Sequence, residues 1–70
     1  METFTINDEF IKLGQVLKAA GLCGSGVDAK YAIIEGNVKV NGVQELQRGK
    51  KIRPGDVVEF NGKQIRIESK

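Results

Sequence analysis

The sequence lacks several residues on which enzyme and metal sites commonly depend. It contains no His, no Trp and a single Cys among its 70 residues. Without His, one subunit cannot build a Ser-His-Asp triad, a Cys-His dyad or the usual Cys/His zinc site. A lone Cys cannot close an internal disulfide, which small secreted domains normally need. We therefore expect a cytoplasmic protein that has no catalytic machinery, cofactor or bound metal.

Long apolar segments are also missing. No apolar run approaches the roughly 18 residues that cross a membrane, and the first residues lack the basic region of a signal peptide, so no membrane partner is expected. The chain is predicted to form one domain, residues 1–70, whose core buries only about 60% of the surface of the unfolded chain. So small a core leaves little room for an enclosed substrate pocket. We expect a monomer that acts through its surface.

The charges are distributed unevenly along the chain. The formal net charge is only +2, yet residues 1–9 carry three acids and no base, whereas residues 10–70 carry eleven bases and six acids. The densest basic segment, residues 48–53, contains Arg48, Lys50, Lys51 and Arg53 and no acid. Such a cluster can hold a local positive potential in a nearly neutral chain. The alternative is a solubilising loop.

Apolar residues at helical spacing predict two short helices. The first spans residues 12–20, and the second spans residues 25–35 and begins with a capping box formed by Ser25 and Asp28. In the second helix, small residues on one face would let the first helix approach closely. The opposite face also needs cover, and Tyr31 is predicted to pack against the first strand. This opposite face consists of Val27, Tyr31 and Ile34.

Short strands precede and follow the helices. Phe4 and Ile6 alternate with threonines, which predicts a strand at the start of the chain. After Gly36, apolar residues alternate with polar ones, and two Asn-Gly pairs, at 41–42 and 61–62, predict tight hairpin turns. The predicted architecture is an α+β fold in which two short helices pack on a small, mainly antiparallel sheet.

About a dozen positions between residues 12 and 60 carry a family resemblance. They are Lys12-Leu13, Leu17, Gly21-Leu22, Ser25, Ala29-Lys30, Ile33, Gly36, Val38, Val40-Asn41-Gly42 and Gly55-Asp56-Val57. In order and spacing they resemble the RNA-binding domain named after the small-subunit ribosomal protein S-four. Nearly the whole chain, including the first strand, is similar to the small stand-alone bacterial members of that family. The resemblance implies the S-four-type fold with its alpha-L motif, non-catalytic binding of structured ribosomal or transfer RNA, and association with the ribosome.

Three positions at the starts of the two helices depart from the broader family pattern. The first helix usually begins Arg-Leu-Asp, but here reads Lys12-Leu13-Gly14. The second usually begins Ser-Arg, but here reads Ser25-Gly26. A planar guanidinium is thus replaced by a point charge at 12, and a basic side chain is missing at 26. This predicts either weaker RNA binding or a shift of the binding surface toward residues 48–53.

The resemblance assigns an RNA-binding face to the helix starts, the first hairpin and the basic segment. Cations at several points of one rigid face suit A-form RNA, which proteins recognise by phosphate spacing and shape. Free backbone N–H groups at the start of the second helix would also attract phosphate. The assignment requires that folding bring these cations onto one surface. The residues assigned are Lys12, Ser25, Gly26, Lys30, Lys39, Asn41, Arg48, Lys50, Lys51 and Arg53.

Each assigned residue also has a purely structural interpretation. A single surface lysine is usually only solvated. Ser25 is first of all a helix cap, and Asn41 is first of all part of a turn. Cys23 is more often a small buried hydrophobe than a reactive thiol, and only Lys18 nearby in the sequence would lower its pKa. Tyr31 could stack on an unpaired base instead of packing.

Three functions compete on this basis. The first is non-catalytic binding of structured RNA. The second is a protein-interaction module whose bases face an acidic or ribosomal partner, and binding to it would depend less on salt. The third is an enzyme or a sulfur carrier. It is disfavoured because carriers end in Gly-Gly whereas this chain ends in Glu68-Ser69-Lys70, and because no His or metal site is available.

Overall fold

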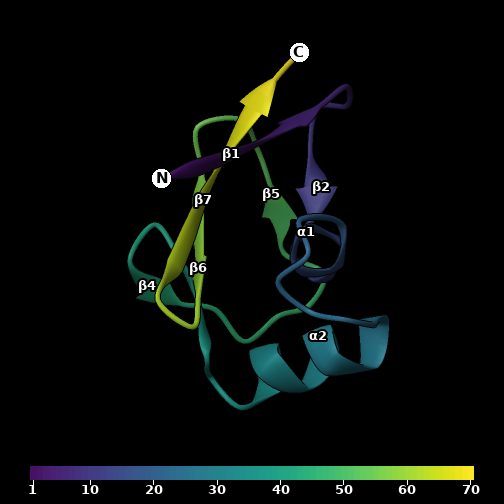
Figure 1. The fold of residues 1–70 in the computed structure, drawn as a ribbon, viewed down its shortest axis with the longest axis vertical. Helices are drawn as coiled ribbons and strands as arrows, with labels where there is room; N and C mark the ends of the chain where they lie inside the picture. Colours follow the sequence, from purple (N-terminus) through teal and green to yellow (C-terminus); the bar gives the residue numbers. More distant parts are fainter.

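The computed structural model covers all 70 residues and contains two helices and seven short strands. Five strands form one sheet in the order β1-β7-β6-β3-β4, and β2 pairs with β5 in a separate ladder (Figure 1). Helix α2 lies at one end of the molecule, and both chain termini lie toward the other (Figure 1). The elements are β1 (Glu2–Ile6), β2 (Ile11–Lys12), α1 (Leu13–Ala19), α2 (Gly26–Ile34), β3 (Val38–Val40), β4 (Val43–Gln44), β5 (Lys51–Ile52), β6 (Val57–Phe60) and β7 (Lys63–Ser69).

The sheet is mainly antiparallel, as the sequence predicts. Antiparallel pairs join β3 to β4, β3 to β6 and β6 to β7, and only β1 pairs with β7 in parallel. Both predicted Asn-Gly turns form: φ is 52° at Asn41 and 83° at Gly42, and 55° at Asn61 and 79° at Gly62. Positive φ at both central residues is the type I′ geometry, whose twist matches that of the flanking strands. These turns fix the hairpin registers.

The core is formed by thirteen buried residues, all of them apolar. The helices contribute Leu13, Val16, Leu17, Ala29, Ala32 and Ile33, and the strands contribute Ile6, Val38, Val40, Ile52, Val58, Ile65 and Ile67. On β3 and β7 the buried residues alternate with exposed ones, so one face of the sheet packs on the helices and the other faces solvent. At about 25 cal/mol per Å² of apolar surface, this burial is the main force that holds the helices to the sheet.

Both helices form close to their predicted bounds. At α2, the Ser25 Oγ accepts the N–H of Asp28 at 3.2 Å, so the serine half of the predicted capping box is present. Gly36 ends this helix with φ of +81°, and its carbonyl accepts a hydrogen bond of 3.0 Å from the Gln44 side chain. The bond ties β4 to the end of the helix. Neither helix is long and apolar enough to cross a membrane.

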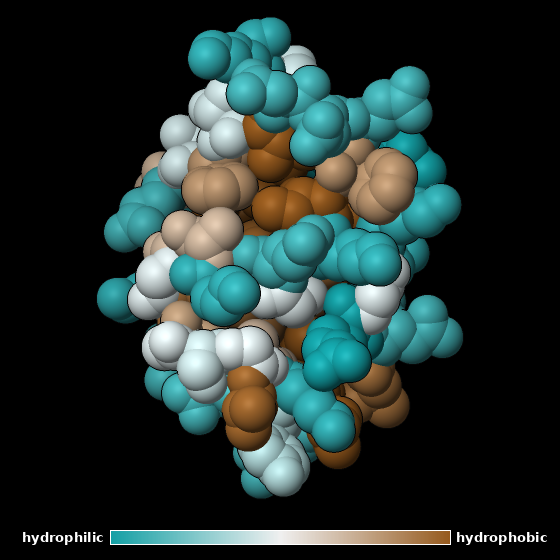
Figure 2. All heavy atoms as spheres, turned by 90° about the vertical axis from the view of Figure 1, so that its right-hand side faces the viewer, coloured by the Kyte–Doolittle hydropathy of each residue, from teal (hydrophilic) through white to brown (hydrophobic).

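The predicted packing of the second face of α2 is wrong. Val27, Tyr31 and Ile34 are 61%, 56% and 55% exposed, and none of them is among the residues packed in or against the core. The helix is held through its other face, which contributes Ala29, Ala32 and Ile33 to the core. A domain of this size has no further layer with which to cover a second helix face. Hydrophobic atoms are accordingly visible at the lower end of the molecule, where α2 lies (Figure 2).

Candidate nucleic-acid interface

The basic segment is fixed to the start of α1 by main-chain hydrogen bonds. The N–H of Leu13 donates to the carbonyl of Lys50 at 2.9 Å, and that of Gly14 donates to the carbonyl of Arg48 at 3.1 Å. The β2–β5 ladder continues this attachment by pairing Lys12 with Lys51. The carbonyls of the loop therefore satisfy N–H groups of α1 that a helix start otherwise leaves free. Arg48 is held beside the two helices as a result.

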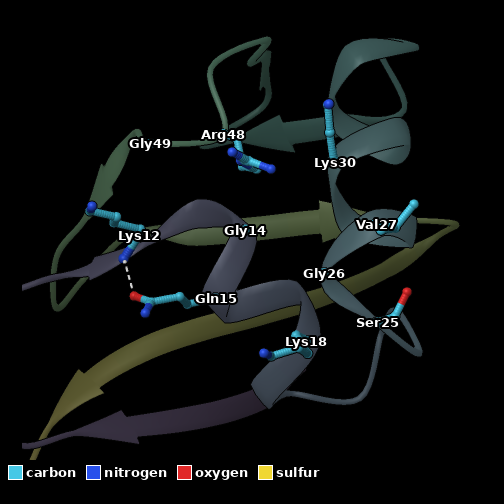
Figure 3. A pocket seen from close by; sticks show the side chains of 10 residues that line it. All are labelled: Lys12, Gly14, Gln15, Lys18, Ser25, Gly26, Val27, Lys30, Arg48 and Gly49. Carbon is cyan, nitrogen blue, oxygen red and sulfur yellow. Dashed lines mark hydrogen bonds between the residues drawn. The ribbon is translucent and has the colours of Figure 1, made fainter.

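A groove of about 690 Å³ lies between the starts of α1 and α2, with residues 48 and 49 lining it as well (Figure 3). Four cations line it, and no carboxylate is among its lining residues. They come from three separate parts of the chain: Lys12 and Lys18 from the first helix and its cap, Lys30 from α2, and Arg48 from the loop. With no acid between them, their positive potentials add along the groove. The lining residues are Lys12, Gly14, Gln15, Lys18, Ser25, Gly26, Val27, Lys30, Arg48 and Gly49.

The start of α2 presents hydrogen-bond donors to this groove. The backbone N–H groups of Gly26 and Val27 have no hydrogen-bond partner within the protein. Ser25 uses its oxygen as an acceptor for the cap, and its hydroxyl proton stays available for donation. A Cβ added at Gly26 would meet no atom within 4 Å, so the backbone here faces open space. Unpaired N–H groups at a helix start favour an anion.

The remaining cations of the basic segment line a second recess, of about 440 Å³, which differs in charge. Lys50, Lys51 and Arg53 lie there together with the carboxylates of Glu45 and Asp56. Opposite charges in one recess reduce the potential that either would hold alone. The cations that were predicted to share one surface are therefore divided between an all-cationic groove and a mixed recess.

Asn41 lines the second recess, but its side chain is committed to the fold. Its Nδ2 donates to a carboxylate oxygen of Asp56 at 3.0 Å, and its Oδ1 accepts the N–H of Val57 at 2.9 Å. Asp56 also accepts the N–H of Arg53 at 2.8 Å. The amide thus joins the β3–β4 turn to the start of β6.

Phe10 is a neighbour of the basic segment that the sequence reasoning missed. The Lys51 Nζ lies 4.8 Å from the centroid of the Phe10 ring, and the Arg53 Cζ lies 5.9 Å from it. Cations at such distances are attracted to the face of an aromatic ring. Only the pairing of residues 11–12 with residues 51–52, which no local pattern specifies, brings them together.

Lys39 lies apart from the other predicted site residues. It is exposed on β3 between the buried Val38 and Val40, and it pairs across the sheet with Glu59 and Gln44. Its side chain therefore belongs to the solvent face of the sheet, opposite the helices.

The ten predicted residues are thus divided among three places. Lys12, Ser25, Gly26, Lys30 and Arg48 line the groove, Asn41, Lys50, Lys51 and Arg53 line the recess, and Lys39 lines neither. Gly14, Gln15, Lys18, Val27 and Gly49 line the groove without having been assigned to a site from the sequence. For two of them a signal was present, because Lys12, Gln15 and Lys18 recur at a spacing of three and so share a helix face.

Cys23 is half-buried beside the core. Burial, and secondarily the negative charge of Asp28, raise the pKa of its thiol above the ordinary value of 9.0. This direction agrees with a small packing residue and is opposite to the shift that a reactive thiolate needs.

The chain is similar to known proteins over most of its length. The S4 domain family matches residues 4–68. A Bacillus subtilis (strain 168) protein named "Probable ribosome maturation protein RlbA" is 45% identical over 58 residues, which are 83% of this chain and 82% of that protein. YbcJ of Escherichia coli (strain K12) is 38% identical over 68 residues, covering 96% of this chain and 97% of YbcJ. The solution structure of YbcJ, described as revealing an alfaL motif involved in RNA-binding, superposes with a TM-score of 0.75 and covers 97% of this chain and 87% of that chain.

Proposed function

This chain belongs to the S4 domain family, and from that premise we propose that it binds structured RNA, without catalysis, in the groove between α1 and α2. The observation that carries the proposal is the groove's lining, which includes four cations from separate parts of the chain and no carboxylate. The relative named as a ribosome maturation protein favours ribosomal RNA over transfer RNA as the partner. Such a partner also implies that the protein acts in the cytoplasm, at the ribosome.

The chemistry of the groove suits a phosphate backbone. A-form RNA hides the base edges of its major groove, so a small protein contacts mainly phosphates and 2′-hydroxyls. Lys12, at the N-cap of α1, and Lys30, on α2, supply point charges. The free N–H groups of Gly26 and Val27 add neutral donors, which bind phosphate oxygens without a basic side chain. Recognition would thus depend on the spacing of phosphates, not on base identity.

The experiment is a titration of the fluorescently labelled full chain with purified ribosomal RNA, with total transfer RNA and with a DNA duplex, over a range of KCl concentrations. Four phosphate contacts predict that the logarithm of the binding constant falls with the logarithm of salt with a slope of about −3. Lys30→Glu should weaken binding and flatten the slope. Lys63→Glu, an exposed lysine that does not line the groove, is the matched charge control.

A protein-interaction role is the second candidate, favoured by the exposed apolar residues Val27, Tyr31 and Ile34. Exposed apolar patches often mark contacts with other proteins. A partner that binds with little salt dependence, and equally well to the wild type and to Lys30→Glu, would support this role and contradict the RNA proposal.

A further inference from the structure

Gly14 and Arg48 are in direct contact at the edge of the groove. A Cβ placed on Gly14 would lie 2.8 Å from the Cγ of Arg48 and 3.4 Å from its Cδ. The first of these distances is shorter than real Cβ contacts allow, so any side chain at position 14 would displace the stem of Arg48. Figure 3 shows Arg48 above Gly14, with Lys12 to one side and Lys30 to the other.

The backbone of α1 does not itself require glycine at this position. Gly14 lies within the helix, outside the positive-φ region that favours glycine. Glycine is also a poor helix former, so local stability alone would favour alanine there. What the missing side chain provides is space, because Arg48 lies across the first turn of α1. The hydrogen bond from Gly14 N–H to the Arg48 carbonyl holds the two backbones together at the same point.

Arg48 is the only arginine among the cations that line the groove. A lysine ammonium is a compact point charge, whereas a guanidinium presents several N–H donors in one plane and can hold two oxygens of a phosphate at once. Its loop is fixed to α1 by two backbone hydrogen bonds, so the start of the side chain is held in place.

Resting on the proposed function, we propose that Arg48 is the bidentate clamp for one phosphodiester group of the bound RNA, and that Gly14 is the positioning residue that admits its side chain to the groove. The two N–H donors of the clamp would meet the two non-bridging oxygens of that phosphate. The lysines and the start of α2 would hold the adjacent phosphates.

The test is a double-mutant cycle of Gly14→Ala and Arg48→Ala in the full chain, with purified ribosomal RNA as the probe. Arg48→Ala should lower the affinity about tenfold and reduce the salt slope by about 0.7 to 0.9. Gly14→Ala should produce the same flattening although it removes no charge. Added to Arg48→Ala, it should change the affinity by less than about twofold. A merely structural effect of Gly14→Ala would leave the salt slope unchanged.

Folding and charge controls accompany the cycle. The urea midpoint of Gly14→Ala measures the gain from a better helix former against the cost of displacing the Arg48 stem, and affinities are compared where both proteins are folded. Arg66→Ala removes the same side chain from the solvent face of β7, outside the groove. Arg48→Lys keeps the charge without the planar fork, so it should retain the slope and lose affinity.

The outcomes separate the two proposals. If the wild type binds ribosomal RNA no better than the DNA duplex, or if Lys30→Glu has no effect, the proposed function fails. If the wild type binds and Lys30→Glu weakens it, while Gly14→Ala keeps wild-type affinity and slope, the positioning role of Gly14 is overturned. An Arg48→Ala effect no larger than that of Arg66→Ala would overturn the clamp.

Discussion

The side chain of Asn41 offers a sharp test of whether a residue predicted to contact RNA serves the fold instead. Its amide makes two hydrogen bonds, to the Asp56 carboxylate and from the Val57 N–H, and its backbone has φ of 52°. Asn41→Ala removes both bonds and places alanine in the left-handed region. Asn61→Ala is the matched control, because Asn61 occupies the same turn position with φ of 55° and makes no side-chain hydrogen bond.

The expected magnitudes follow from these differences. Both bonds of Asn41 are exposed, so water replaces them in the variant, and each contributes about 0.5 to 1 kcal/mol. Left-handed backbone adds about 1 kcal/mol of strain for alanine. Asn41→Ala should therefore lower the free energy of unfolding by about 2 to 3 kcal/mol, and Asn61→Ala by about 1 kcal/mol. For a domain of this size, whose total stability is about 4 to 10 kcal/mol, the first loss is large.

Urea unfolding followed by far-ultraviolet circular dichroism measures both values by linear extrapolation. Affinity for ribosomal RNA, measured where both variants are folded, should stay near that of the wild type. Equal stability losses for the two variants would contradict the structural role of the Asn41 amide. If Asn41→Ala also lost RNA affinity, the amide would contact RNA, as the family resemblance implies.

Two further predictions concern residues near the groove. Tyr31→Ala should change the free energy of unfolding by no more than about 0.5 kcal/mol in the same urea assay, because the side chain is exposed; a loss of several kcal/mol would mean that it packs against the protein. For Cys23, the raised pKa means that the folded state favours the protonated thiol. This preference stabilises the folded state fully below pH 9.0, the ordinary pKa of the thiol. The stabilisation is lost as pH rises through the pKa of the folded state. Cys23→Ser should therefore remove part of the loss of stability measured between neutral and strongly alkaline pH, and an unchanged pH profile would contradict the shift.

Local signals predicted the two helices, the first strand and the two Asn-Gly hairpins, because each depends on neighbours in the sequence. The β2–β5 ladder was not predicted. The Asn-Gly pairs specify type I′ turns by their tolerance of positive φ, and Ser25 caps α2 through an amide three residues away. The parallel pairing of β1 with β7 has no such signal, because it joins the two ends of the chain. Tyr31 was placed wrongly for a related reason. Helical spacing shows which residues share a face, but not whether another element will cover that face.

The candidate site was predictable only in part, because its residues meet through long-range contacts. The resemblance marked Lys12, Ser25, Gly26 and Lys30, which lie at the two helix starts and do line one groove. It could not separate Arg48 from Lys50 and Lys51. Arg48 and Gly49 lie in a turn, in which the N–H of Lys50 donates to the carbonyl of Gln47, whereas Lys51 lies in β5. The carbonyls of this loop cap α1, and that contact turns Arg48 toward the helices.

The division of the cations bears on how a nearly neutral protein can bind a polyanion. With a net charge of +2, long-range attraction is weak, so the proposed affinity for RNA would come from short-range contacts in places free of carboxylates. The groove meets this condition, whereas the second recess contains Glu45 and Asp56. There, two of the cations already lie against the Phe10 ring.

The departures of this chain at positions 14 and 26 fit the same arrangement. At position 14, where the resemblance implies an acid, glycine leaves space for Arg48. At position 26, where it implies a basic side chain, the backbone faces open space. We therefore expect charge changes in the groove to govern the salt slope, and those in the recess to act mainly through the fold.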